Sequence, residues 1–185
     1  MSSQCLSGVK HVSLLTTGGT IEKTYDPLQG VFQNDVSVLD IMLSGLELVG
    51  VSLDRESVMN KDSLDMDQAD HLLIAETAMQ RAASHDGVII VHGTDTLSRT
   101  GETLDGLAGR TLPVPVVLTG AMRPWLLRTS DALQNLTEAI LAVQLLDPGV
   151  YVCMHSNVLR FPGVVKNRSA LRFERAHQVH SEEGQ

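Results

Sequence analysis

The residues best suited to chemistry in this sequence are hydroxyl and charged side chains gathered in four short segments. These segments are Thr16–Thr20, His92–Thr96, Thr119–Pro124 and His155–Asn157. Any one of them could be only a tight turn or a helix cap, but four together favour a binding or catalytic site. Paired glycines such as Gly18-Gly19 let backbone N–H groups approach a small anion or a developing oxyanion.

Three of the residues could together activate a hydroxyl nucleophile. A threonine hydroxyl attacks efficiently only when a base removes its proton or a neighbour lowers its pKa. Thr94, Asp95 and Lys166 offer such a set, because an aspartate can hold a lysine, and a desolvated lysine can lose its proton and act as a base. The alternative interpretation is that Asp95 is a helix N-cap and Lys166 a solvated surface charge. Spacing alone leaves both open.

Sequence motifs of nucleotide, serine-hydrolase and metal chemistry are missing. There is no G-x-G-x-x-G, no G-x-x-x-x-G-K-[ST] and no G-x-S-x-G. The seven histidines do not fall at metal-ligand spacings, and the only two cysteines, Cys5 and Cys153, indicate neither a disulfide framework nor a metal site. We therefore expect no cofactor and no metal.

The polar segments follow short apolar runs that we interpret as buried strands. Apolar runs without alternation suit strands that are covered on both faces. The runs are Val12–Leu15, Val88–Val91, Val114–Leu118 and Val150–Met154. In open α/β sheets, ligands bind outside the carboxyl ends of the strands, where the polar segments would meet.

Segments with helical spacing lie between these runs. The predicted helices are Ala69–Ser84, with Asp65 or Asp67 as N-cap, Ser130–Leu146, and two weaker ones at Val36–Leu43 and Thr100–Ala108. Alternating strands and helices predict an α/β fold: a mostly parallel, Rossmann-like or flavodoxin-like layered sheet with helices on both faces.

The size and charge of the chain limit its organisation and partners. A length of 185 residues suits a single domain over 1–185, with a polar C-terminal extension over 167–185 that we expect to be partly frayed. With 14 basic and 22 acidic residues the net charge is −8, which disfavours binding to nucleic acid or to anionic membranes. Neither a secretory signal nor a membrane-spanning run is recognisable, so a cytoplasmic location is expected.

Three segments resemble bacterial-type L-asparaginases and their glutaminase-asparaginase relatives. Thr17–Ile21 and His92–Thr96 resemble the two signature segments of that family, and Gly120–Pro124 together with Ser130-Asp131 and Asn135 resembles a third. The resemblance extends from about residue 10 to Lys166 and corresponds to the N-terminal domain of the family, whose fold it implies.

The resemblance also implies roles for five residues. Thr17 matches the nucleophilic threonine, and Tyr25 the tyrosine that polarises it. Thr94, Asp95 and Lys166 match a triad that takes part in proton transfer. The implied reaction is a double displacement: the threonine attacks the side-chain amide of L-asparagine, ammonia leaves, and water hydrolyses the β-aspartyl ester to L-aspartate. Low activity on L-glutamine is expected.

The loop Asn60–Met66 resembles the loop that holds the α-carboxylate of the substrate in this family, with Ser63 in the binding position. The substrate-binding residues expected from the resemblance are Gly18, Asp62, Ser63, Leu64, Gly93 and Ala121. Relatives often have glutamine where Leu64 stands, so one donor for the carboxylate is lost. Backbone N–H groups near Thr94 and Ala121 are expected to hold the oxyanion.

The chain departs from longer family members in length, because the second, smaller domain is absent. We expect a natural short form rather than a fragment, since the charged end after Glu182 suits a terminus. Longer relatives complete the α-ammonium site from a neighbouring subunit, so a homo-oligomer, dimer or tetramer, is also expected.

Two other functions fit the same residues. An amidotransferase-type subunit would feed ammonia to a partner that acts on aminoacyl-tRNA, but such subunits carry extra domains for which this chain has no spare residues. A binding module without turnover would be expected to lack the nucleophile or the lysine, yet Thr17, Tyr25, Thr94, Asp95 and Lys166 are all present.

Overall fold

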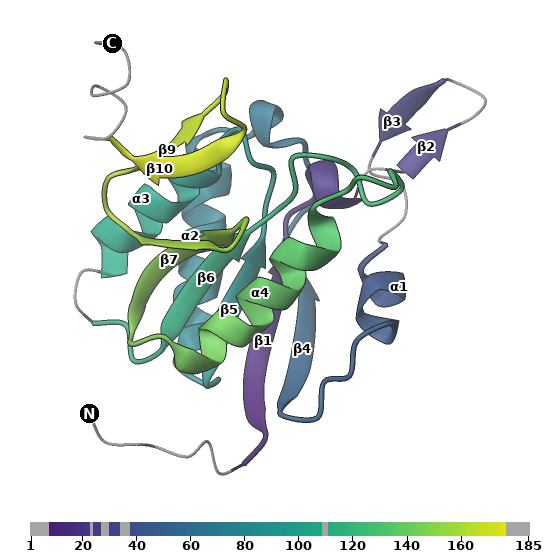
Figure 1. The fold of residues 1–185 in the computed structure, drawn as a ribbon. Helices are drawn as coiled ribbons and strands as arrows, with labels where there is room; N and C mark the ends of the chain where they lie inside the picture. The colour runs from purple at the N-terminus through teal and green to yellow at the C-terminus, as the bar shows by residue number, and fades with distance from the viewer. Residues whose placement is uncertain (1–7, 23, 27–29, 34–37, 109–110, 177–185) are drawn as a thin grey trace.

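A six-stranded, mostly parallel sheet forms the centre of the molecule, in the order β4-β1-β5-β6-β7-β8 (Figure 1). The computed structural model describes residues 8–22, 24–26, 30–33, 38–108 and 111–176. All neighbouring strands in this sheet are parallel except the antiparallel pair β7 and β8. The strands are β1 (Lys10–Thr16), β4 (Val51–Ser57), β5 (Gly87–Val91), β6 (Pro115–Thr119), β7 (Gly149–Met154) and β8 (Asn157–Arg160). The predicted α/β fold class is confirmed.

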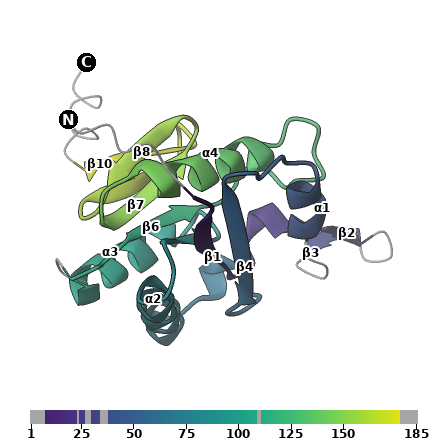
Figure 2. The same ribbon diagram turned by 90° about the horizontal axis from the view of Figure 1, so that it is seen from below.

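Helices cover both faces of the sheet (Figure 2). One face carries α2 (Gln68–Ala82) and α3 (Leu97–Ala108), and the other carries α1 (Leu39–Ser44) and α4 (Ala132–Leu145). Alternate strand residues supply the two cores, because successive side chains of a strand point to opposite faces. Leu15 packs toward α2 and α3, whereas its neighbour Leu14 packs toward α1 and α4.

The four predicted strands and the two long predicted helices are present with boundaries shifted by one or two residues. Helix α2 begins with a capping box in which the side chain of Asp67 accepts a hydrogen bond from the backbone N–H of Asp70, and the side chain of Asp70 accepts one from Asp67. Of the two N-caps considered, Asp67 is therefore the one used. Helix α3 begins at Leu97, three residues before the predicted start at Thr100.

Several short elements were not predicted from the sequence. They are the edge strands β4 and β8, the antiparallel pairs β2 (Thr24–Asp26) with β3 (Val31–Gln33) and β9 (Val164–Asn167) with β10 (Arg172–Arg175), and the 3₁₀ helices η1 (Thr20–Glu22) and η2 (Ser63–Asp65). The expected frayed extension after residue 166 contains β10, because Phe173 is buried in the core and pairs with Lys166. Residues 177–185 lie outside the described ranges.

The order of the strands places a topological switch point between β1 and β5. The chain passes from β1 to β4 on one side of it and then to β5 on the other. In open α/β sheets, ligands bind at such a switch point, outside the carboxyl ends of the strands, so the loops after β1 and β5 are where a site is expected. No helix in the described ranges is long and apolar enough to cross a membrane.

Candidate active site

Three loops pack closely against one another at this switch point. A Cβ atom added to Gly19 would lie 2.5 Å from the Cα atom of Gly93, and one added to Gly93 would lie 2.6 Å from the Oγ atom of Ser63. Gly18 and Gly19 have φ values of +88° and +90°, a region that side chains other than glycine rarely adopt. The loop after β1, the loop after β5 and η2 thus form one continuous surface.

Lys166 reaches this surface from β9 and joins the predicted triad. Its Nζ atom donates to the Oγ1 atom of Thr94 at 2.7 Å and to the Oδ1 atom of Asp95 at 3.0 Å. The side chain of Lys166 is only 12% exposed, so it is not the solvated surface charge of the alternative interpretation. Arg168, which sequence reasoning did not assign to the site, lies 3.4 Å from the same Oδ1 atom with a 70% exposed side chain.

Thr17, the residue expected to be the nucleophile, is held at the end of the sheet. Its side chain is fully buried, and its hydroxyl donates to the backbone carbonyl of Val91 at 3.0 Å. The backbone N–H of Thr17 donates to the same carbonyl. An attacking oxygen must be reachable and must be able to give its proton to a base. Through these two hydrogen bonds, Thr17 links the end of β1 to the end of β5.

Thr20 is better placed to present a hydroxyl at this edge. Of the three threonines in Thr16–Thr20, it is the one that is partly exposed. It begins η1 directly after Gly19, whose backbone lies against Gly93. Thr20 therefore emerges beside the loop that carries Thr94. In the sequence, Thr20 lies in the same signature segment as Thr17. Its position directly after the paired glycines was the feature that could have indicated its exposure.

The expected substrate loop is tied to the other two loops by hydrogen bonds. The hydroxyl of Thr96 donates to the carbonyl of Ser63 at 2.8 Å, and the backbone N–H of Lys61 donates to the carbonyl of Thr17 at 3.0 Å. The side chain of Asp62 caps η2 by accepting from the backbone N–H of Leu64 at 3.1 Å. Ser63 is buried, whereas Leu64 is 64% exposed. Leu64 thus contributes an apolar rim.

Asp131 holds the third signature segment together through several hydrogen bonds. Its carboxylate accepts hydrogen bonds from the backbone N–H groups of Met122 and Arg123, from the side chain of Asn135 and from the ring of His155. Burial opposes ionisation of this carboxyl, but these donors outweigh it and hold the pKa of Asp131 below its ordinary value.

Two further residues expected in the site are Ala121 and Tyr25. Ala121 is fully buried and packs in the core on the α1 and α4 side of the sheet. Tyr25 lies in β2, opposite Phe32 of β3, and its side chain lies outside the described part of the structure. Within the described ranges, no group of three or more His, Cys, Asp or Glu side chains could hold a metal ion.

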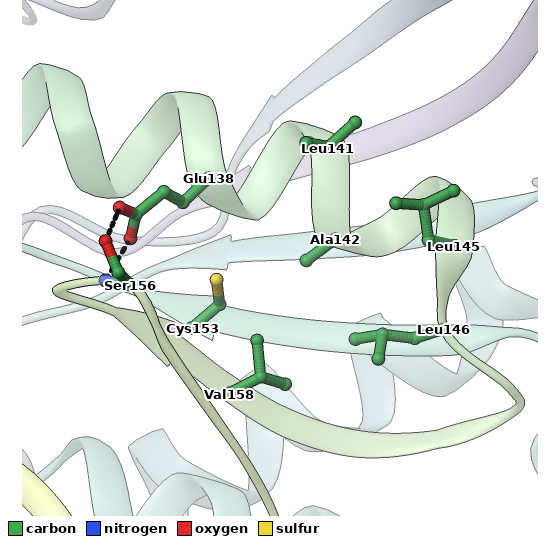
Figure 3. A pocket seen from close by; sticks show the side chains of 8 residues that line it. All are labelled: Glu138, Leu141, Ala142, Leu145, Leu146, Cys153, Ser156 and Val158. Atoms are coloured by element: carbon green, nitrogen blue, oxygen red, sulfur yellow. Dashed lines mark hydrogen bonds between the residues drawn. The ribbon is translucent and has the colours of Figure 1, made fainter.

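A separate apolar pocket lies between α4 and the strands β7 and β8 (Figure 3). Its volume is about 330 Å³. Its lining contains none of the residues assigned to the site above, and comprises Glu138, Leu141, Ala142, Leu145, Leu146, Cys153, Ser156 and Val158. Burial raises the pKa of the Cys153 thiol to about 11, so this cysteine is not a reactive thiolate near neutral pH.

Comparison with known proteins is consistent with this geometry. The chain is 32% identical over 148 residues to an L-asparaginase of Thermococcus kodakarensis, covering 79% of this chain and 44% of that protein. It is 35% identical over 148 residues to one subunit of the glutamyl-tRNA(Gln) amidotransferase of Haloquadratum walsbyi, covering 79% of this chain and 33% of that protein. The structure matches the thermostable L-asparaginase from Thermococcus kodakarensis with a TM-score of 0.80 and 30% identity, over 89% of this chain and 51% of that chain.

The chain therefore spans about half or less of the length of these relatives. The family described as asparaginase, N-terminal, matches residues 11–177. Together with the strand order and the three loops at the switch point, this match shows that the chain belongs to the asparaginase family and corresponds to its N-terminal domain.

Proposed function

We propose that this chain hydrolyses the side-chain amide of L-asparagine to L-aspartate and ammonia. The observation that carries the proposal is the contact of Lys166 with Thr94 and Asp95, because it joins a partly buried amine to a hydroxyl and a carboxylate at the switch point. Membership of the asparaginase family supports amide hydrolysis as the reaction.

In this proposal Thr20, in place of Thr17, attacks the amide carbon. The Thr20 oxygen forms an ester with the β-carbonyl carbon, the C–N bond breaks, and the proton of the attacking hydroxyl leaves with the amine as ammonia. Thr94 can relay that proton, because its oxygen accepts from Lys166 while its own proton remains free to be donated. Water then hydrolyses the ester and restores the Thr20 hydroxyl.

In this proposal, Asp95 binds one end of the substrate and the loop around Ser63 binds the other. Asp95 keeps its second oxygen for the α-ammonium group, since Lys166 and Arg168 both contact the first. The loop around Ser63 would hold the α-carboxylate. Tyr25 stays a proposed partner of the nucleophile. Backbone N–H groups near Thr94 and Ala121 would hold the oxyanion.

The first test is ammonia release from L-asparagine by the purified chain and by matched threonine variants. Thr20→Val is expected to abolish release, whereas Thr20→Ser retains it because the hydroxyl remains. Thr17→Val is expected to lower stability and keep measurable activity. Loss of activity in Thr17→Val with retention in a folded Thr20→Val would return the nucleophile to Thr17.

Selectivity for asparagine over glutamine is a second measurable part of the proposal. Glutamine is one methylene longer, and a methylene discriminates by about 1–3 kcal/mol in an apolar pocket. We expect kcat/KM for L-asparagine to exceed that for L-glutamine by about 10- to 200-fold. Comparable turnover of the two amides would reject this selectivity.

A second candidate function is that of an ammonia-producing component of an amidotransferase. The 35% identity to the glutamyl-tRNA(Gln) amidotransferase chain of Haloquadratum walsbyi favours it specifically. In that case the folded chain alone would release little ammonia from either amide, and activity would appear only with a partner protein. Binding of the amino acid by calorimetry without any turnover, with or without partner, would instead indicate a binding module.

The expected homo-oligomer and cytoplasmic location stay part of the proposal. Leu141 and Leu145 on α4 are 59% and 63% exposed, which leaves apolar surface available for a subunit contact. Sedimentation of the purified chain would distinguish a monomer, a dimer and a tetramer.

A further inference from the structure

A buried line of hydrogen bonds runs from α2 through α3 to the loop after β5. The Nδ1 atom of His71 lies 2.8 Å from the Oγ1 atom of Thr100, and the same Oγ1 atom lies 2.8 Å from the Nε2 atom of His92. The Nδ1 atom of His92 lies 2.8 Å from the backbone carbonyl oxygen of Gly93. All three side chains are 1% exposed or less. None of the three side chains has been given a role in the site described above.

The chemistry of the four groups assigns a single direction to this line. The carbonyl of Gly93 can only accept, so the Nδ1 atom of His92 carries the proton. The Nε2 atom of the neutral ring is then an acceptor, and the hydroxyl of Thr100 donates to it. Having donated its only proton, Thr100 accepts from the Nδ1–H of His71. Burial, more than any other cause, lowers the pKa of His92 to about 4 and also lowers the pKa of His71, which keeps both rings neutral near pH 7.

We propose that His71, Thr100 and His92 form a directional relay that positions the Gly93–Asp95 loop for amide hydrolysis. The relay ends on the carbonyl of Gly93, one residue before the Thr94 hydroxyl that Lys166 contacts. It acts through that loop and touches no reacting atom, so its members are positioning residues. The inference rests on the proposed function for its kinetic consequence, but its geometry stands independently.

Packing alone does not account for this arrangement. The two imidazole rings are stacked, with centroids 6.2 Å apart and planes at 13°, but apolar side chains would fill the same space without desolvating four polar nitrogen atoms. The Nε2 atom of His71 is buried and has no hydrogen-bond partner, which opposes stability. What the two histidines and the threonine add is a fixed orientation of the Gly93 carbonyl.

The first test observes the tautomers directly and needs no catalytic activity. Nitrogen-15 NMR of the histidine rings in the full chain at pH 7 is expected to show His71 and His92 both protonated at Nδ1 and unprotonated at Nε2. A proton on the Nε2 atom of either ring would overturn the relay. Thr100→Val, which keeps the shape but lacks the hydroxyl, is expected to shift the backbone resonances of Gly93, Thr94 and Asp95.

The second test separates positioning from folding by kinetics. Thr100→Val is expected to lower kcat for L-asparagine by about 10- to 100-fold with little change in KM, because a small misplacement affects the chemical step most. Thr100→Ser restores the hydroxyl and should recover most of kcat. Thr77→Val, which removes a less buried helical hydroxyl bonded to the carbonyl of Leu73, should leave kcat unchanged.

The outcomes distinguish the relay from the proposed function. If the parent chain releases no ammonia but shows both predicted tautomers and the shifts in Thr100→Val, the relay stands and the proposed function fails. If Thr100→Val folds and keeps both the parental kcat and the loop resonances, the relay is rejected and the proposed function stands. If Thr100→Val does not fold, the tautomers of the parent and the kcat of Thr100→Ser decide.

Discussion

The Nζ atom of Lys166 lies 2.7 Å from the Oγ1 atom of Thr94, although 72 residues separate them in the sequence. Replacing the lysine by methionine keeps an apolar stem and removes the charge and its donors. We expect Lys166→Met to lower kcat by about 10²- to 10⁴-fold, the usual loss when a proton-transfer group is removed. The measurement is steady-state ammonia release at pH 7.

The matched control is Arg168→Gln, which removes the other cation at Asp95. Because the side chain of Arg168 is 70% exposed, water and salt screen its interaction, and we expect only a small change in kcat. An undiminished rate in Lys166→Met, or an equal loss in both variants, would contradict the role given to Lys166.

Gly93→Ala is expected to damage the site by displacing the substrate loop. The new methyl group would lie 2.6 Å from both the Cβ and the Oγ atoms of Ser63. Ser63 must therefore move, and we expect a higher KM together with a lower thermal midpoint. The control is Gly106→Ala in α3, where an added Cβ meets nothing within 4 Å. There alanine should stabilise the fold by about 1 kcal/mol. An unchanged KM in Gly93→Ala would show that Ser63 does not bind substrate.

Asp131→Asn is expected to destabilise the chain at neutral pH by about 2–3 kcal/mol, because it removes a buried charged acceptor of several hydrogen bonds. Since the pKa of Asp131 is lowered in the folded state, its contribution is present above the ordinary carboxyl pKa and is lost as the pH falls through the folded value. The difference between parent and variant should therefore shrink in acid. Urea unfolding followed by the fluorescence of the single tryptophan, Trp125, measures it.

Asp105→Asn, unlike Asp131→Asn, is not expected to destabilise the chain. Burial, followed by the neighbouring charge of Glu102, raises the pKa of Asp105, so its ionised form opposes folding. Asparagine should be neutral or slightly stabilising at pH 7. If Asp105→Asn and Asp131→Asn lost the same stability, the hydrogen bonds to Asp131 would not explain the effect of Asp131→Asn.

The stability of the parent chain should fall as the pH drops from about 6.5 to 4. The folded state keeps His92 neutral down to a pKa of about 4, whereas the unfolded chain takes up a proton near pH 6.5. The unfolded state therefore binds more protons in this window, and the cost reaches on the order of 3 kcal/mol. His71 acts in the same direction. Replacing His92 by asparagine should flatten the dependence of the unfolding free energy on pH. An equally steep dependence in that variant would assign the effect to other groups.

The sequence predicted the elements whose pattern is set by burial. β1 and β5 are apolar on both faces because helices cover both sides, and their runs were recognisable for that reason. β4 was missed because it lies at the edge of the sheet, where Asp54 and Glu56 remain outside the core and break the apolar run. The pattern of apolar residues therefore predicts the central strands of such a sheet but not its edge strands.

The sequence predicted which segments the fold brings together, but not the surroundings of each side chain in them. The threonines on the two sides of Gly18-Gly19 look interchangeable in the sequence, but Thr17 still hydrogen-bonds to Val91 at the sheet end, and Thr20 lies beyond it. His71 and Thr100 could not be connected with His92 from the sequence, because the packing of α2 against α3 brings them together. Arg168 was not assigned to the site from the sequence, because its approach to Asp95 depends on how β9 is placed.

The stacked loops have a consequence for engineering. Gly120 adds a further layer, since a Cβ atom there would lie 2.3 Å from the carbonyl oxygen of His92. At Gly19, Gly93 and Gly120 an added Cβ atom would lie within 2.6 Å of a neighbouring loop, so substitutions in this inner layer are expected to disturb the packing of the loops. Leu64 and Arg168, both largely exposed, lie outside it. Under the proposed function, diversity aimed at changing substrate preference belongs at these two exposed positions.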